Sequence, residues 1–280
     1  MLSLSLGPFA IATVHLLLLG SLALAILAGW LAGRSRRVNP EPTLFGLFLL
    51  GLLAARLAFV FTYWPQYQGN PVQIIDIRDG GFLAWPGVLA VILGAAWRLW
   101  RVAALRRPLA AGLLAGLLCW SLGSLAIQHV ERGSALPDIM LADASGTATP
   151  LTAHRGKPLV INLWASWCAP CRREMPALQA AQNARRDVIF LFVNQMEAPA
   201  EATRFLTSQH LTLDHSLFDD NGELAREVGA MALPATLFYS AEGRLLNSHM
   251  GELSEASLQH ALERFDNPPS SSPSLSRSAE

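Results

Sequence analysis

Two cysteines separated by two residues, Cys168 and Cys171, limit most strongly what this chain can fold into. They follow an apolar run at 158–164, Pro-Leu-Val-Ile-Asn-Leu-Trp, that is typical of a buried strand, and they precede a stretch of helical character. A strand that ends at Cys-x-x-Cys, which then opens a helix, presents a redox-active pair of thiols. Unpaired N–H groups at the helix start favour the thiolate of Cys168, and Cys171, one turn inside, is close enough to form a disulfide with it.

A zinc site is the alternative interpretation of such a pair, because structural zinc takes four Cys or His ligands at short spacings. The chain has three cysteines, and the third, Cys119, lies far away in an apolar segment. The cysteine count therefore favours redox chemistry. We expect no metal, and no cofactor other than the Cys168–Cys171 disulfide itself.

Residues 134–266 resemble the TlpA/ResA-like membrane-anchored thioredoxins of bacterial envelopes. The resemblance is carried by the string Asn-x-Trp-Ala-x-Trp-Cys-x-Pro-Cys at 162–171, by Glu174-Met175-Pro176, and by Leu-Pro-Ala-Thr at 233–236. It implies an α/β thioredoxin fold, and a cis peptide bond between Leu233 and Pro234 that faces the dithiol. A cis proline is rarely accidental, and its missing N–H leaves the neighbouring backbone free to pair with a substrate strand. Taken without the dithiol, Pro234 would be an ordinary trans proline in a loop.

The predicted catalytic residues are Cys168, Cys171, Glu174 and Pro234. Cys168, more exposed at the helix start, is the nucleophile, and Cys171 resolves the mixed disulfide. Ordinary thioredoxins have a buried aspartate at the place of Asn162, whose amide cannot take a proton. Glu174, one turn past Cys171, matches the acidic residue of the TlpA/ResA-like group and is the candidate for proton transfer. The alternative is an exposed carboxylate, because Glu is common in first turns for dipole reasons.

The surroundings of the dithiol supply the predicted substrate-binding residues, which are Trp164, Trp167, Pro170 and Leu233. We expect the two tryptophans to pack around the dithiol and shield it. The spacing of apolar residues further predicts a central strand at 188–193 and helices at 199–210, 219–228 and 255–265, the last capped by Ser254, with a strand hairpin at 236–250.

The N-terminal half is too apolar for a soluble domain. The chain is 52% hydrophobic and only 15% charged, and four apolar stretches lie at about 9–32, 43–64, 82–100 and 108–129. Each is near the ~20 residues that a membrane helix needs. The predicted fold class is an N-terminal all-α transmembrane bundle of four helices, residues 1–132, and a C-terminal α/β thioredoxin-fold domain, residues 133–266, followed by a disordered tail, 267–280.

Arginines predict the orientation of the four spans. They cluster after the first stretch and between the third and fourth, whereas the 65–81 loop carries only Arg78 beside Asp76 and Asp79. By the positive-inside rule the Arg-rich loops are cytoplasmic, which puts the dithiol outside. We therefore expect a multi-pass protein of the bacterial inner membrane with its thioredoxin domain in the periplasm. A cleaved signal peptide is the alternative for the first stretch, although no basic segment precedes it.

The segment 51–95 resembles prolipoprotein diacylglyceryl transferase through Ala55-Arg56-Leu57, through 71–75 and through Gly80-Gly81. Trp85-Pro86 stands where that family has His-Gly, and no group that could activate an incoming thiol is visible. We interpret this half as a repurposed scaffold rather than a transferase. Arg56, in the middle of a membrane helix, indicates a function: it binds an anionic headgroup or pairs with Asp76 or Asp79, the structural alternative being snorkelling.

The main hypothesis is a membrane-tethered periplasmic reductase of disulfides in envelope proteins, with apocytochrome c as a client typical of the family. A disulfide oxidase or isomerase with the same site is one alternative, and a lipid-handling membrane protein with an accessory thioredoxin module is another. The membrane half has no cysteine pair, so electrons must come from a membrane donor of the DsbD/CcdA type. The sequence has no basic stripe with interleaved aromatic residues, so nothing in it indicates a nucleic-acid partner.

Overall fold

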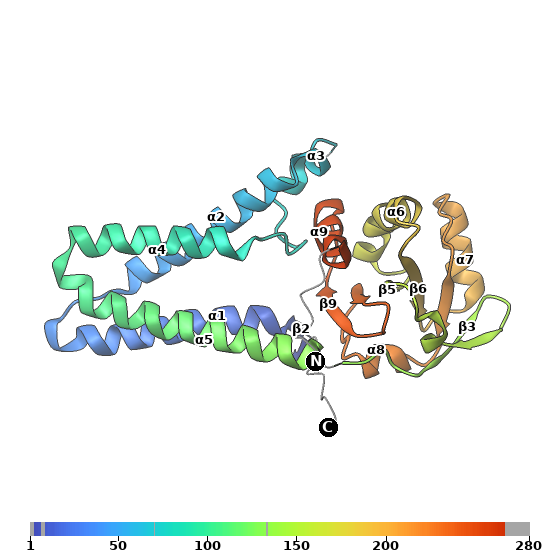
Figure 1. Cartoon of the computed structure of the whole chain (residues 1–280), viewed down its shortest axis with the longest axis horizontal. Coiled ribbons are helices and arrows are strands. Elements are labelled where there is room, and N and C mark those ends of the chain that lie inside the picture. The colour runs from blue at the N-terminus through green and yellow to red at the C-terminus, as the bar shows by residue number, and fades with distance from the viewer. Residues whose placement is uncertain (1–2, 7–8, 70, 133, 267–280) are drawn as a thin grey trace, which may run out of the picture.

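The computed structural model describes residues 3–6, 9–69, 71–132 and 134–266, and within them a helical half lies beside an α/β half (Figure 1). The predicted tail lies outside the described residues. After a short hairpin of β1 (Ser3–Leu6) and β2 (Phe9–Ala12), the long helices of the helical half are α1 (Thr13–Gly33), α2 (Glu41–Thr62), α4 (Ala84–Arg101) and α5 (Arg106–Arg132). Short helices α3 (Trp64–Tyr67) and η2 (Pro71–Ile74) fill the loop between α2 and α4, called the outer loop because the positive-inside rule predicts it outside the membrane. Helices η1 (Arg34–Arg36) and η3 (Ala103–Leu105) fill the other two turns.

The long helices pack in two close pairs, α1 with α5 and α2 with α4. Glycines allow the close approach. A Cβ on Gly112 of α5 would lie 2.7 Å from the carbonyl oxygen of Ala25, and a Cβ on Gly87 of α4 would lie 2.8 Å from that of Gly51. Small residues at helix crossings are typical of membrane proteins, because they let backbones touch where the hydrophobic effect does not drive helices together.

Three helical segments of the described residues are long and apolar enough to cross a membrane: Thr13–Gly33, Glu41–Thr62 and Ala103–Val130. Their outward faces expose large apolar side chains, among them Leu19, Leu53, Leu114 and Leu122. The third predicted span is helix α4, which carries Pro86 near its start and Arg98 and Arg101 at its end. A fourth crossing therefore stays a prediction.

The α/β half is built on one mixed sheet of strand order β4-β3-β7-β6-β5-β8-β9. The strands are β3 (Met140–Asp143), β4 (Ala148–Pro150), β5 (Leu159–Trp164), β6 (Ile189–Gln195), β7 (Ser216–Asp219), β8 (Ala235–Tyr239) and β9 (Leu245–Met250). The central strands β5, β6 and β7 are parallel, and β8 runs antiparallel to β5. Its helices are η4 (Leu151–His154), α6 (Ala169–Ala184), α7 (Pro199–Ser208), α8 (Glu223–Glu227) and α9 (Glu255–Asp266). This is the predicted thioredoxin-like fold.

Strand β5 shows how the sheet is buried on both faces. Its six residues are all buried, and alternate side chains enter different cores, as the two-residue period of a strand requires. Val160 and Trp164 pack with residues of α6, α7 and α9, whereas Ile161 and Leu163 pack with residues of η4 and α8. The first core therefore fixes the start of α6, where the cysteines lie.

The predicted helix at 219–228 is shorter in the structure, because its first residue ends a strand that the sequence did not reveal. Asp219 closes β7, and its carboxylate accepts hydrogen bonds from the backbone N–H groups of Glu223, at 2.8 Å, and Ala225, at 3.3 Å. Gly222 is the N-cap residue of α8, and an acidic residue three positions earlier that accepts from the first-turn N–H groups is easily assigned to the helix itself.

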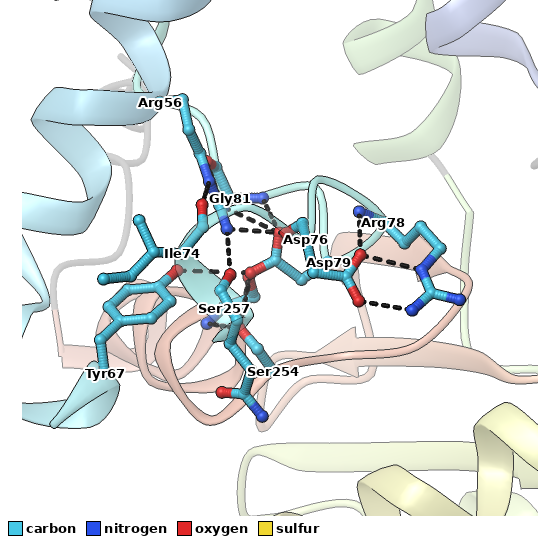
Figure 2. Close-up of polar contacts among 10 residues, drawn as sticks. Arg56, Tyr67, Ile74, Asp76, Arg78, Asp79, Gly81, Ser254 and Ser257 are labelled. Carbon is cyan, nitrogen blue, oxygen red and sulfur yellow. Dashed lines mark hydrogen bonds and ion pairs between the residues drawn. The ribbon is translucent and has the colours of Figure 1, made fainter. Parts of the chain in front are cut away.

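Arg56 of α2 organises the outer loop (Figure 2). Its side chain is buried and pairs with the carboxylate of Asp79 at 2.9 Å. Its other four N–H groups donate to backbone carbonyl oxygens of the loop, those of Gln73, Ile74, Asp76 and Gly81. A guanidinium has five N–H donors, and all five are taken within the protein. The predicted pairing with Asp79 is confirmed, and the headgroup alternative is wrong because no donor is left for a lipid phosphate.

Candidate active site

The dithiol lies at the junction of β5 and α6. Strand β5 ends at Trp164, Cys168 caps the helix, and α6 begins at Ala169. Cys168 and Cys171 are joined by a disulfide, with their Cα atoms 5.3 Å apart. The backbone N–H of Cys171 donates to Sγ of Cys168 at 3.3 Å, so the first sulfur replaces the side-chain oxygen of an ordinary cap.

The two sulfurs differ in access as their sequence positions predicted. Cys168 is 5% exposed and Cys171 is fully buried. Pro170 stands in the first turn of α6, where its missing N–H would have no helical partner in any case. Cys168 is therefore the more accessible of the two to a partner disulfide, which fits its predicted role as the nucleophile, and the buried Cys171 fits that of the resolving cysteine.

Glu174 is buried behind the dithiol and is not an exposed helix carboxylate. Its side chain is 1% exposed. Oε1 accepts a hydrogen bond from Nδ2 of Asn162 at 2.8 Å, and Oε2 accepts one from the backbone N–H of Leu253 at 2.9 Å. The same Asn162 amide donates to Oγ1 of Thr236 at 3.0 Å. The amide that replaces the expected aspartate thus holds the carboxyl group that stands one helical turn from Cys171.

Burial raises the pKa of Glu174 from its ordinary 4.5 to about 8. The hydrogen bonds from Leu253 and Asn162 act in the opposite direction, because they favour the ionised form, but desolvation is larger. A carboxyl group with a pKa near neutrality can both give and accept a proton at pH 7. Glu174 is therefore chemically suited to serve a thiol that alternates between protonated and disulfide forms.

Pro234 follows a cis peptide bond with Leu233, as expected from the resemblance. Leu233 is half-buried and packs against both cores of the sheet. The carbonyl oxygen of Pro234 accepts a hydrogen bond from the N–H of Gly251 at 2.9 Å. The turn before β8 is thus tied to the segment that follows β9, the same segment that supplies Leu253 to Glu174.

The two tryptophans do not share the predicted role. Trp164 is 1% exposed and packs against Phe205, with ring centroids 5.8 Å apart. Trp167 is 65% exposed, so the expectation that it packs into the structure around the dithiol is wrong, while its role in substrate binding stays a prediction. The turn at 165–168 carries its side chain outward after the strand has ended.

Glu197 is a residue that the sequence analysis missed. Its carboxylate accepts hydrogen bonds from the backbone N–H of Ser166 at 2.7 Å, from the Ser166 hydroxyl, and from Nδ2 of Asn194 at 2.7 Å. Ser166 lies two residues before Cys168, so Glu197 holds the turn that carries the nucleophile. The sign available in the sequence was a carboxylate two residues after the end of the buried strand β6.

Two arginines that follow the dithiol are engaged with other groups. The guanidinium of Arg172 lies over the ring of Phe205, 5.4 Å from its centroid. Nε of Arg173 donates to Glu252 at 2.9 Å. Among the described residues, no group of three or more His, Cys, Asp or Glu side chains is placed to hold a metal ion. Cys119 lies in α5, apart from the pair.

Comparison with known proteins divides the chain at the same place. The profile of the redoxin family matches residues 131–262, and that of prolipoprotein diacylglyceryl transferase matches residues 2–123. The thiol:disulfide interchange protein DsbE of Pseudomonas fluorescens is 31% identical over 124 residues, which are 44% of this chain and 68% of that protein. The thiol-disulfide oxidoreductase ResA of Geobacillus thermodenitrificans is 29% identical over 136 residues, 48% of this chain and 78% of that protein. Thioredoxin-like protein YneN of Bacillus subtilis is 27% identical over 138 residues, 48% and 80% of the two chains.

A thioredoxin-like sheet with a disulfide at the start of its active-site helix defines a thiol-disulfide oxidoreductase. The relatives agree with this class in their names. The chain belongs to the DsbE/ResA-like family of thiol-disulfide oxidoreductases, and it carries in addition an N-terminal region that matches the diacylglyceryl transferase profile.

Proposed function

We propose that the protein is a membrane-tethered reductase that acts on oxidised cysteine pairs of proteins in the bacterial envelope, with its thioredoxin-like domain in the periplasm. The three apolar helices and the match to a membrane enzyme support the tether. The Arg-rich loops after α1 and before α5 support the orientation. Apocytochrome c is a client of the kind that the family resemblance implies.

The observation that carries the direction of electron flow is that, among the described residues, the nucleophilic sulfur has a backbone N–H as its hydrogen-bond donor and not a cationic side chain. Sγ of Cys168 accepts from a backbone N–H, and the nearby cations of Arg172 and Arg173 are turned to Phe205 and Glu252. Strong oxidants of this fold owe their potential to a stabilised reduced form. A thiolate that gains little beyond the helix N-terminus favours a dithiol that gives electrons away.

Glu174 supports thiol-disulfide exchange at this site, in either direction, through proton transfer. Reduction of a client disulfide requires Cys171 to lose a proton before it attacks the mixed disulfide. A buried carboxyl with its pKa raised to about 8 is a suitable acceptor at one helical turn's distance.

A membrane electron donor of the DsbD/CcdA type is the proposed source of electrons. The membrane half holds one cysteine, Cys119, whereas a disulfide relay across the bilayer needs two thiols.

The reduction potential of the dithiol tests the proposal. We expect a glutathione or dithiothreitol titration of the full-length protein in detergent to give a value within a few tens of millivolts of about −270 mV. A value near −120 mV would contradict the reductase and favour an oxidase or isomerase with the same site.

A second candidate follows from the match of residues 2–123 to prolipoprotein diacylglyceryl transferase. The membrane half would then handle a lipid, and the dithiol would protect a lipoprotein cysteine. Against transfer chemistry, Trp85-Pro86 replaces the His-Gly of that family, and Arg56 is saturated by the protein's own oxygen atoms. A labelled-lipid transfer assay in proteoliposomes separates the candidates, because only a lipid-handling protein would move label to an acceptor peptide.

A further inference from the structure

Helix α9 of the thioredoxin-like domain packs directly on the outer end of α2. The hydroxyl of Tyr63, which directly follows α2, donates to Glu263 at 2.6 Å and lies 2.7 Å from Nδ1 of His260. Ala256, near the start of α9, is 1% exposed because it sits in an apolar cluster of the membrane half, formed by Phe59, Val60, Tyr63 and Tyr67. The two halves are therefore joined by an apolar contact with specific hydrogen bonds at its edge.

A second contact joins the domain to the buried ion pair of the membrane half (Figure 2). The hydroxyl of Ser254, just before α9, donates to Oδ2 of Asp79 at 2.8 Å, and Oδ1 of the same carboxylate pairs with Arg56. Arg56 lies six residues before the end of α2 at Thr62, about 9 Å along the helix axis. The domain thus contacts the outer loop at Asp79, the loop residue that is ion-paired with Arg56 below the end of α2.

The contact segment also lies behind the active site. Leu253, the neighbour of Ser254, donates its N–H to Glu174, and Gly251 donates to the carbonyl oxygen of Pro234. A continuous chain of contacts therefore runs from the helix that carries the dithiol, through Glu174, Leu253, Ser254 and Asp79, to Arg56. A cavity of about 340 Å³ between α6 and the outer loop is lined by both halves, including Gln66, Asp76, Arg173 and Glu252.

We propose that this docking holds the dithiol at the bilayer surface, so that the preferred partners are disulfides held close to the membrane, in membrane-embedded or lipid-anchored proteins. The inference rests on the proposed function, since it names the substrate class of the same dithiol. In a domain on a flexible tether, the distance between the sulfurs and the bilayer surface would vary widely. In a domain docked through Ala256, Tyr63 and Ser254, that distance is fixed.

The reaction itself balances without a further reagent. The thiolate of Cys168 attacks one sulfur of the client disulfide, forming a mixed disulfide and releasing the other client sulfur, which takes up a proton. The thiolate of Cys171 then attacks Sγ of Cys168, which forms the internal disulfide and releases the second client thiol. The client gains two electrons and two protons, and the Cys168–Cys171 pair loses them.

The test measures reduction at two heights. The full-length protein, reduced beforehand, is placed in proteoliposomes with a lipid-anchored peptide that carries one disulfide. Helical spacers of about 10 and about 40 residues hold that disulfide about 15 Å and about 60 Å from the anchor. We expect the near disulfide to be reduced at least about tenfold faster than the far one. Equal rates at both heights would overturn the inference and leave the reductase intact.

Matched variants show whether docking causes the preference. Ala256→Arg forces a charge into the contact and should bring the near-to-far ratio to about one, while Gln259→Arg, on the exposed face of the same helix, should keep it. Tyr63→Phe removes the two hydrogen bonds without a new charge and should give an intermediate ratio. The same peptide without lipid should be reduced at equal rates by all four proteins, which shows that each is folded. An unchanged ratio in Ala256→Arg would overturn the inference, and failure of the wild type to reduce any of the three peptides would instead overturn the proposed function.

Discussion

Arg56 in the membrane half and Glu174 in the dithiol domain are both buried and ionisable, and the protein treats them in opposite ways. Arg56 meets five acceptors, one of them a carboxylate. Among the residues that the structure describes, Glu174 meets two neutral donors and no cation, and its pKa rises to about 8. A guanidinium cannot lose its charge in a protein, so the fold must satisfy it completely, whereas a carboxyl group can become neutral. The first arrangement builds structure, and the second leaves a proton available for chemistry.

The largest effect is expected at the dithiol itself. Cys168→Ser should abolish turnover, and Cys171→Ser should stop the reaction at a mixed disulfide between Cys168 and the client, because the resolving thiol is gone. Non-reducing gel electrophoresis with a client peptide detects the trapped adduct. If Cys168 in the Cys171→Ser protein does not react with iodoacetamide, the roles of the two sulfurs are reversed.

Removal of the guanidinium should damage structure and not chemistry. Arg56→Met leaves Asp79 buried without its cation and should destabilise the membrane half by about 3–5 kcal/mol. Unfolding of the full-length protein in mixed micelles measures this. Arg78→Met, which breaks the exposed pair with Asp76, is the matched control and should unfold like the wild type.

A dithiol potential that changes in Arg56→Met while the fold is retained would show that the two buried sites are not separate in role. Equal stability of Arg56→Met and the wild type would show that the loop does not depend on the five hydrogen bonds.

Glu174→Gln should damage chemistry and spare structure. The amide cannot accept the proton of Cys171, so the resolving step should slow by about a hundredfold at pH 7. The variant should also lower the pKa of the accessible thiol, since the carboxylate form of Glu174 repels a thiolate. Stopped-flow kinetics and thiolate absorbance against pH follow both effects. Superimposable curves for the two proteins would leave Glu174 without a part in the reaction.

The same variant isolates the pH dependence of stability. Because the native state raises the pKa of Glu174 from 4.5 to about 8, its neutral form stabilises the fold. That contribution is complete below the unfolded pKa and is lost as pH rises through about 8. Wild-type stability should therefore fall relative to Glu174→Gln between pH 5 and 8, by at most about 1.4 kcal/mol per pH unit. Denaturant titrations of both proteins at three pH values measure their free energies of unfolding, and a wild type that gains stability relative to Glu174→Gln as pH rises would contradict the prediction.

Glu197 should give the smallest effect. Glu197→Gln weakens two hydrogen bonds from Ser166, in the turn before Cys168, and one from Asn194 of β6, each worth about 1.5–3 kcal/mol when the acceptor is charged. Because the amide keeps part of them, we expect the N–H of Ser166 to exchange with deuterium only about tenfold faster. Glu201→Gln, at an exposed position of α7, is the control. Unchanged exchange at Ser166 would mean that the turn is held by other contacts.

The sequence correctly predicted the features that depend on residues close together in the chain. The Cys-x-x-Cys pair, the helix it opens and the carboxyl of Glu174 one turn later are set by spacing along one segment. The outward direction of Trp167 was missed because an apolar residue beside a core strand reads as buried. Strand β7, four residues long, was missed because so short a run shows no clear period.

Long-range contacts account for most of the rest. Ser254 was recognised as a helix cap, and its N-capping bond to the N–H of Ser257 is present at 3.1 Å. Its second bond, to Asp79, joins residues 175 positions apart, and no local pattern indicates such a partner. The pKa of Glu174 likewise depends on burial by segments that meet only in the folded protein.

The shared hydroxyl of Ser254 makes the two halves of this fusion hard to exchange. A thioredoxin-like domain taken from a relative would bring its own redox chemistry but would leave Asp79 without Ser254, just before α9, and the Tyr63 hydroxyl without its partner Glu263 on α9. Grafted domains that keep Ser254, Ala256, His260 and Glu263 should dock on the end of α2. Grafted domains that lack these residues should be connected to the membrane half only by a flexible linker. In this protein, the last helix of the thioredoxin-like domain serves as the adaptor that any replacement module must reproduce.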